Sequence, residues 1–134
     1  MYKSYIPYLQ HILDECLYVR SVITGEMQME QFLQDETLKR AVTRSLSIIG
    51  EATKKIPTDV KYAWQRISWR QMAGMRDRLV HDYMGVNYYI VWDVAKNIIP
   101  ELTNQIQEVI DASQEQVSSP DSGPQALPSD EEPL

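Results

Sequence analysis

Cysteine is almost absent from the sequence, and this scarcity excludes several classes of protein. Cys16 is the only cysteine among 134 residues, so an internal disulfide cannot form and the paired Cys/His spacing of a zinc site is missing. The five glycines are scattered and form no phosphate-binding loop. We therefore expect no metal site and no cofactor, and the single thiol fits a reducing compartment such as the cytoplasm.

Long hydrophobic runs are also missing. The first six residues lack the basic and apolar segments of a signal peptide, and no apolar run approaches the length that spans a bilayer. We expect a cytoplasmic protein without a membrane partner. With 134 residues the chain is long enough for one domain with a single core.

Negative charge predominates, but it is unevenly distributed. The net charge is −6, and five of the acids lie after residue 114, where there is no Lys or Arg. Residues 54–78 instead hold seven Lys and Arg against two acids. A basic region on a nearly neutral body can recruit a polyanion, although a solvated helix face would give the same pattern.

Apolar residues recur at helical spacing in four segments. The segments cover residues 8–25, 36–56, 69–83 and 88–112, with a short helical turn at 29–33. The connections between them are short, which favours antiparallel neighbours. The sequence therefore predicts an all-α fold, namely an antiparallel four-helix bundle with one short extra helix.

The end of the chain differs in composition from the rest. Residues 1–113 contain the four helical segments and form the predicted helical domain. Residues 114–134 are rich in Ser, Pro and acids and have almost no apolar side chains, which is typical of a flexible, disordered tail.

Single residues predict where the helices start, bend and end. Asp35 or Glu36 can begin the second helix, and Asn87 can cap the fourth. Gly50 lies inside the second helix and suggests the close approach of another helix. Gly85 is expected to end the third helix. Pro100 is expected to bend the fourth helix about one turn before itself rather than to end it.

Cys16 and His11 raise the possibility of a nucleophilic pair, which the spacing does not favour. Cys16 shares the apolar stripe of the first helix and is expected to be a small core residue. His11 lies five residues earlier, off the face of Cys16.

Residues 75–83 bring together three side chains that suit a phosphodiester substrate. Arg76 is a fixed cation, His81 carries a proton near neutral pH, and Tyr83 adds a hydroxyl-bearing ring. On a continuous helix Arg76 and Tyr83 nearly eclipse, and His81 lies about 140° round from Arg76. Taken alone, His81 would more simply be a core or capping histidine.

The chain resembles the HEPN superfamily and, within it, the HepT toxin family. The family motif is Arg, four residues, His, one residue and Tyr, with a polar residue commonly after the Arg. Here these positions are Arg76, His81, Tyr83 and Asp77, at the predicted junction of the third and fourth helices. Two further points of match are Ile49-Gly50-Glu51-Ala52 and Val91-Trp92-Asp93-Val94. The likeness covers about residues 5–112 and does not include the acidic tail.

The resemblance implies a metal-independent endoribonuclease that acts as a homodimer, with two Arg/His sets facing one RNA cleft. Structured RNA, with tRNA as a common target, is the implied substrate. The family implies the toxin of a type II toxin–antitoxin pair. Its antitoxin is an MntA-like nucleotidyltransferase that neutralises the toxin by AMPylation of the motif tyrosine, here Tyr83.

The chemistry of RNA cleavage gives each side chain an expected role. Arg76 stabilises the charged phosphorane, and His81 moves protons. A helix C-terminus at His81 would favour the imidazolium form. Asp77 would support the site by orienting Arg76 or Arg78, or it is simply a surface acid. The motif offers only one histidine per chain for two proton transfers, which is a chemical reason to expect a dimer that supplies a second.

The sequence also leaves two other hypotheses of function open. The same bundle could bind RNA and a nucleotidyltransferase without cutting, with Arg76 as a phosphate contact. It could also be a purely structural helical partner, which the co-location of Arg76, His81 and Tyr83 with the basic stretch disfavours. The nearby aromatic side chains could form an RNA platform, but bundle packing or dimer contact suits most of them better. These are Trp64, Trp69, Tyr88, Tyr89 and Trp92.

Overall fold

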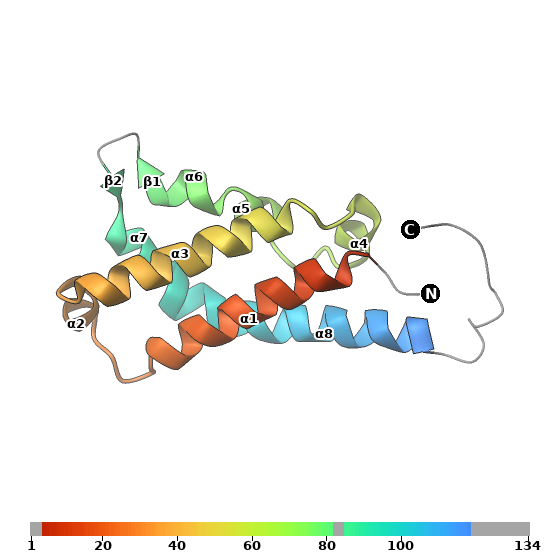
Figure 1. Cartoon of the computed structure of the whole chain (residues 1–134), viewed down its shortest axis with the longest axis horizontal. Helices are drawn as coiled ribbons and strands as arrows, with labels where there is room; N and C mark the ends of the chain where they lie inside the picture. Colours follow the sequence, from red (N-terminus) through yellow and green to blue (C-terminus); the bar gives the residue numbers. More distant parts are fainter. Residues whose placement is uncertain (1–3, 82–84, 119–134) are drawn as a thin grey trace.

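The chain folds as a bundle of helices whose direction alternates along the sequence. This computed structural model describes residues 4–81 and 85–118, and for Val80, His81 and residues 116–118 it describes the backbone alone. Figure 1 shows α1 (Ile6–Val22) running one way, α3 (Glu36–Thr53) returning beside it, and the later helices repeating this pattern. The predicted all-α, antiparallel bundle is confirmed.

Short elements connect the long helices. The loop between α1 and α3 contains α2 (Met29–Leu33), as predicted. After α3 come α4 (Thr58–Ala63), α5 (Trp69–Ala73) and α6 (Met75–Leu79). The last helical stretch consists of α7 (Tyr88–Asp93), the π-helix η2 (Val94–Ile98) and α8 (Ile99–Ser118). Within the described residues no helix is both long and apolar enough to cross a membrane.

The core lies where α1, α3 and α8 meet, and the helical periodicity of the sequence explains which side chains fill it. One stripe of each helix is buried, as expected when apolar side chains recur every three or four residues. The buried stripes are Leu9, Ile12, Leu13, Cys16 and Val19 on α1, Val42, Leu46 and Ile49 on α3, and Leu102, Ile106, Val109 and Ile110 on α8.

Two helix starts follow the predicted capping residues. The Asp35 carboxylate accepts a hydrogen bond from the Leu38 amide at 2.9 Å, which begins α3. The Asn87 side chain accepts from the amides of Tyr89 and Ile90 at 3.1 and 3.3 Å, which begins α7. Both contacts satisfy amides that have no partner inside the first helical turn.

The predicted continuous helix over residues 69–83 is wrong. Helix α5 ends at Ala73, α6 ends at Leu79, and the chain then forms a hairpin of β1 (Val80–His81) and β2 (Gly85–Val86). The strands are antiparallel, with His81 opposite Gly85. Gly85 has a φ of 120°, so it serves the hairpin and does not end a helix. Strands of two residues are too short to show an alternating pattern in the sequence.

Pro100 disturbs the last helix at the predicted place. Proline offers no N–H to the carbonyl of Lys96, four residues earlier, and its ring crowds that turn. The structure has the π-helix η2 at this point instead of a regular α turn, and the chain continues directly into α8. The expectation that Pro100 does not end the helix is therefore confirmed. The Lys96 ammonium donates to the carbonyl oxygens of Thr24 and Gly25 at 3.0 and 2.8 Å and thereby holds the loop after α1.

Gly50 allows α5 and α6 to approach α3 closely. A Cβ atom at this position would lie 3.0 Å from the Met72 carbonyl oxygen and 3.3 Å from Met75 Cβ. A glycine inside a helix costs about 1 kcal/mol relative to alanine, so the close contact must compensate for it. The close approach that the sequence predicts at Gly50 is therefore confirmed.

Gly50→Leu is expected to destabilise the bundle because its side chain meets backbone atoms that cannot rotate away. We expect the free energy of unfolding to fall by about 1–3 kcal/mol, as for other overpacked sites. Urea denaturation followed by circular dichroism measures the change. Arg40→Leu, at an exposed position of the same helix, is the control and should change stability by less than about 0.5 kcal/mol. An unchanged unfolding midpoint for Gly50→Leu would contradict the packing argument.

Candidate functional site

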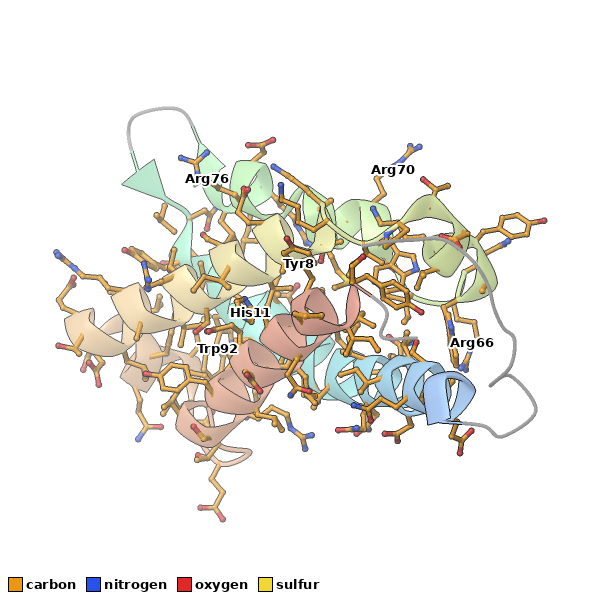
Figure 2. The ribbon with its side chains drawn as sticks, turned by 45° about the vertical axis from the view of Figure 1, so that its right-hand side comes forward. Tyr8, His11, Arg66, Arg70, Arg76 and Trp92 are labelled. Carbon is orange, nitrogen blue, oxygen red and sulfur yellow. The ribbon has the colours of Figure 1, made fainter. Side chains whose placement is uncertain are left out.

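The motif arginine lies on the outer side of α6. Met75 and Leu79 are buried on the inner side of this short helix, which leaves the three residues between them facing outward. Arg76, Asp77 and Arg78 are all exposed. Figure 2 shows Arg76 extending from α6 away from the core.

His81 and Tyr83 are not on the helix that carries Arg76. His81 lies in β1, so the expected position in the last turn of a helix is wrong, and the helix dipole gives no reason for an imidazolium there. The helical register between Arg76 and Tyr83 is wrong as well, since α6 ends at Leu79. The His81 side chain and all of Tyr83 lie outside the described residues.

Ion pairs divide the basic stretch into two groups. Arg66 pairs with Glu108 of α8 at 3.2 Å, and Lys54 pairs with Glu51 one turn away at 3.2 Å. Among the described residues Arg76 and Arg78 have no acidic partner within 4.0 Å, and Asp77 contacts neither of them in this way. A guanidinium without a partner keeps its charge available for an anionic ligand.

A groove of about 430 Å³ connects Arg76 to α1 and α3. Tyr8 and His11 of α1 border it on one side, and Arg76 of α6 borders it on the other. Figure 2 shows these side chains with α3 between their two helices. The remaining lining comes from α3 and the turn that follows it. It consists of Arg44, Ser47, Ile48, Glu51 and Ala52 in the helix and Lys55 two residues after its end.

Sequence reasoning missed this groove, although one signal for it exists. Arg44, Ile48 and Glu51 follow each other at helical spacing and form a second stripe on α3, apart from the buried one, and Lys55 continues this spacing just after the helix ends. Nothing in the local sequence places that stripe beside Arg76, because α1 and α6 reach it only through tertiary packing.

Arg78 belongs to a different pocket from Arg76. A cavity of about 240 Å³ lies between the α5–α6 segment and the last helical stretch. Its charged lining consists of Arg66, Arg78 and Glu101, and Ser68, Gln71, Asn97 and Gln105 add polar atoms. The two motif-region arginines therefore face separate surfaces, and they do not form one cationic clamp.

Most of the nearby aromatic side chains serve packing. Trp92 lies against Phe32 with 5.5 Å between the ring centroids. Trp69 is buried, and its indole N–H donates to the Trp64 carbonyl oxygen at 3.0 Å. Tyr89 differs, because 64% of its surface is exposed. Bundle packing, which the sequence favours for most of them, explains the tryptophans.

Cys16 is a core residue, as predicted. The side chain is fully buried between α1 and α8, and burial raises the pKa of its thiol to about 12, although a hydrogen bond with Thr103 partly lowers it. His11 lies in the exposed groove instead. A Cys/His nucleophilic pair is therefore excluded for these two side chains.

Comparisons with known proteins identify one family. The sequence profile of the family described as Ribonuclease HepT-like matches residues 12–109. A relative from Caldanaerobacter subterraneus subsp. tengcongensis, which carries the name "Putative RNase", is 44% identical over 108 residues, covering 81% of this chain and 96% of the relative. A protein from Thermococcus cleftensis named "Probable ribonuclease HepT" is 40% identical over 109 residues, covering 81% and 98% of the two chains. No solved structure matches the chain.

Alkylation of Cys16 tests the description of the core. Only the thiolate reacts, and a pKa of about 12 in place of 9.0 lowers its population about 1,000-fold at mildly alkaline pH. The folded protein should therefore react with a thiol reagent at least about 1,000-fold more slowly than the same protein in urea. Mass spectrometry over time measures both rates. Rapid alkylation of the folded protein would mean that Cys16 is accessible and reactive.

Proposed function

The chain belongs to the HepT-like ribonuclease family, and from this premise we propose that it is a metal-independent endoribonuclease acting on structured RNA, with tRNA as the expected class. The proposal rests on the exposure of Arg76 and on its unneutralised positive charge. Arg76 is exposed, has no acidic partner among the described residues, and lies on the border of a groove with two further cations. His81 follows within the next five residues, in the hairpin that continues α6.

The reaction is a transesterification in which the RNA supplies its own nucleophile. The 2′-oxygen attacks the adjacent phosphorus as its proton passes to a base, and a bond from phosphorus to the 2′-oxygen forms. The bond from phosphorus to the 5′-oxygen then breaks, and an acid protonates the leaving oxygen. Two proton transfers and the charge of the phosphorane are therefore what the protein must manage.

Arg76 is the residue proposed to stabilise the phosphorane. Its guanidinium stays protonated at all relevant pH values and presents a planar fork to two phosphate oxygens. The groove beside it is open to solvent in the isolated chain, and a bound strand would displace that water. A dry site strengthens the attraction between the guanidinium and the charge that develops on the phosphate.

His81 is the residue proposed to move protons. An imidazole can serve as a base in one transfer and as an acid in the other. The reaction needs both functions in one turnover, and each chain contributes one histidine of the motif. We propose that a homodimer with twofold symmetry supplies the pair, so that two Arg76/His81 sets face one RNA cleft.

Tyr83 is proposed as the switch, that is, the residue whose modification inactivates the ribonuclease. It lies in sequence between the two hairpin strands and follows His81 by two residues. An MntA-like nucleotidyltransferase would transfer AMP to its hydroxyl group, placing a bulky anion close to where the RNA phosphate must bind. This would make the protein the toxin of a type II toxin–antitoxin pair and the nucleotidyltransferase its antitoxin.

A second function uses the same surface without catalysis. The cations at the groove can bind an RNA backbone by charge alone, whatever His81 does. In that case the protein is a HEPN module that binds RNA and a nucleotidyltransferase. Cleavage assays in the presence of a chelator distinguish the two, because binding without catalysis leaves the RNA intact.

Replacing the motif pair tests the enzyme. Arg76→Ala and His81→Ala should each reduce RNA cleavage at least about 100-fold, since each removes stabilisation that matters in the transition state. The assay follows labelled tRNA on a gel with chelator present, and circular dichroism checks folding. Arg70→Ala removes an exposed arginine of α5 outside the groove and should leave cleavage unchanged. A folded His81→Ala protein with normal activity would refute the mechanism.

Intact-mass measurement tests the switch. After co-expression with an MntA-like nucleotidyltransferase, the protein should gain the mass of at least one AMP group and lose its ribonuclease activity. Tyr83→Phe should abolish the added mass, because the acceptor hydroxyl is gone. Tyr89→Phe removes an exposed tyrosine hydroxyl of α7 and should not affect the added mass. Added mass that persists in Tyr83→Phe would assign the modification to another residue.

A further inference from the structure

We propose that the groove between α1, α3 and α6 binds the backbone of the RNA strand beside the cleaved phosphate. The proposal rests on the ribonuclease function proposed above and assigns further binding residues to it. Arg44 of α3 and Lys55, in the turn after α3, contact phosphates, and Tyr8 of α1 stacks on a base. We call these backbone contacts the RNA track. Arg76, at the edge of the same groove, connects the RNA track to the reacting phosphate.

The spacing of two cations along the groove suits a strand of several nucleotides. Arg44 lies within α3 and Lys55 lies in the turn two residues after its end, and both line the groove. Eleven residues at about 1.5 Å each separate the two positions by up to about 16 Å. A stacked strand with about 3.4 Å per nucleotide covers that distance in about five nucleotides. This length lies within the usual range for one single-strand binding site.

The charge of the groove favours an anionic occupant. Arg44, Lys55 and Arg76 line it and have no acidic partner among the described residues. Glu51 is the acid among the lining residues, and its carboxylate is already paired with Lys54 at 3.2 Å. The net charge of the lining is therefore positive, although the whole chain carries −6. A polyanion that follows the groove would meet all three cations.

The surface between the cations suits the rest of a nucleotide. Tyr8 is 38% exposed at one side of the groove, where its ring is available to a base. Ile48 and Ala52 give the floor an apolar character against which sugars can pack. Aromatic side chains beside a cationic groove are the usual combination in proteins that bind single-stranded nucleic acid.

A second copy of the chain is a poorer occupant for this groove. A twofold interface centred on it would bring Arg44, Lys55 and Arg76 of one chain close to the same three cations of the other. Like charges in a buried interface are repelled, and each would also lose its hydration. RNA has the opposite charge and is therefore favoured.

Binding at several salt concentrations tests the RNA track. The full-length His81→Ala protein, which should not cut, is titrated with a labelled single-stranded RNA oligonucleotide. Each lost phosphate contact should lower the slope of log affinity against log salt by about 0.7, so Arg44→Gln and Lys55→Gln should each show this decrease. Tyr8→Ala should weaken binding about tenfold, whereas Tyr8→Phe keeps the ring and should bind normally.

Arg70→Gln is the matched control for the loss of one positive charge. Arg70 is exposed on α5 and points away from the groove in Figure 2, so its removal should leave the salt slope unchanged. Circular dichroism establishes that each variant is folded, and light scattering gives its oligomeric state. These measurements separate a lost RNA contact from a damaged fold or a changed assembly.

The outcomes separate this proposal from the enzyme itself. Unchanged slopes for Arg44→Gln and Lys55→Gln, together with normal cleavage by the wild-type protein, would overturn the RNA track and leave the ribonuclease intact. Lower slopes with no cleavage by the wild-type protein would support the RNA track and overturn the enzyme. A change of oligomeric state in Arg44→Gln or Lys55→Gln with unchanged RNA binding would assign the groove to a protein interface and overturn the proposal.

Discussion

The close contact between Gly50 of α3 and the backbone of α5 determines where the motif arginine lies. With a Cβ position only 3.0 Å from the Met72 carbonyl oxygen, any larger residue would push the α5–α6 segment outward. Met75 and Leu79 are buried below α6, so Arg76 must point away from the core. The result is that Arg76 lies beside the outer stripe of α3, and a groove forms where the two helices and α1 meet.

The two motif residues depend on different parts of the structure. The position of Arg76 depends on α6 and its packing against α3, whereas His81 belongs to a hairpin held by local backbone contacts. The Asn87 amide donates to the Leu79 carbonyl oxygen at 2.8 Å and closes this hairpin, and the Asn87 side chain caps α7. The proposed catalytic pair therefore spans two elements, a packed helix and a short hairpin.

The sequence predicts the parts of this architecture that depend on long periodic segments or on local hydrogen bonds. The stripes of α1, α3 and α8, the caps at Asp35 and Asn87 and the role of Gly50 belong to this class. The sequence predicts one helix over residues 69–83 and fails at residues 80–81 and 85–86, because a hairpin of two-residue strands leaves no periodic signal. It also cannot place Arg44 and Lys55 beside Arg76, since that contact joins segments about twenty residues or more apart in the sequence and depends on tertiary packing.

The basic stretch shows why local charge must be judged from the fold. Arg66 and Lys54 are occupied by Glu108 and Glu51, so they stabilise the surface and offer little to a ligand. Exposed ion pairs of this kind contribute at most about 1 kcal/mol, and their main effect here is to neutralise charge. Of the cations that remain, Arg76 borders the α1–α3–α6 groove and Arg78 lines the separate pocket beside η2. Arg76 borders the groove that further cations line. Electrostatic attraction of an RNA strand to this groove would therefore bring the strand next to the residue proposed to stabilise the transition state.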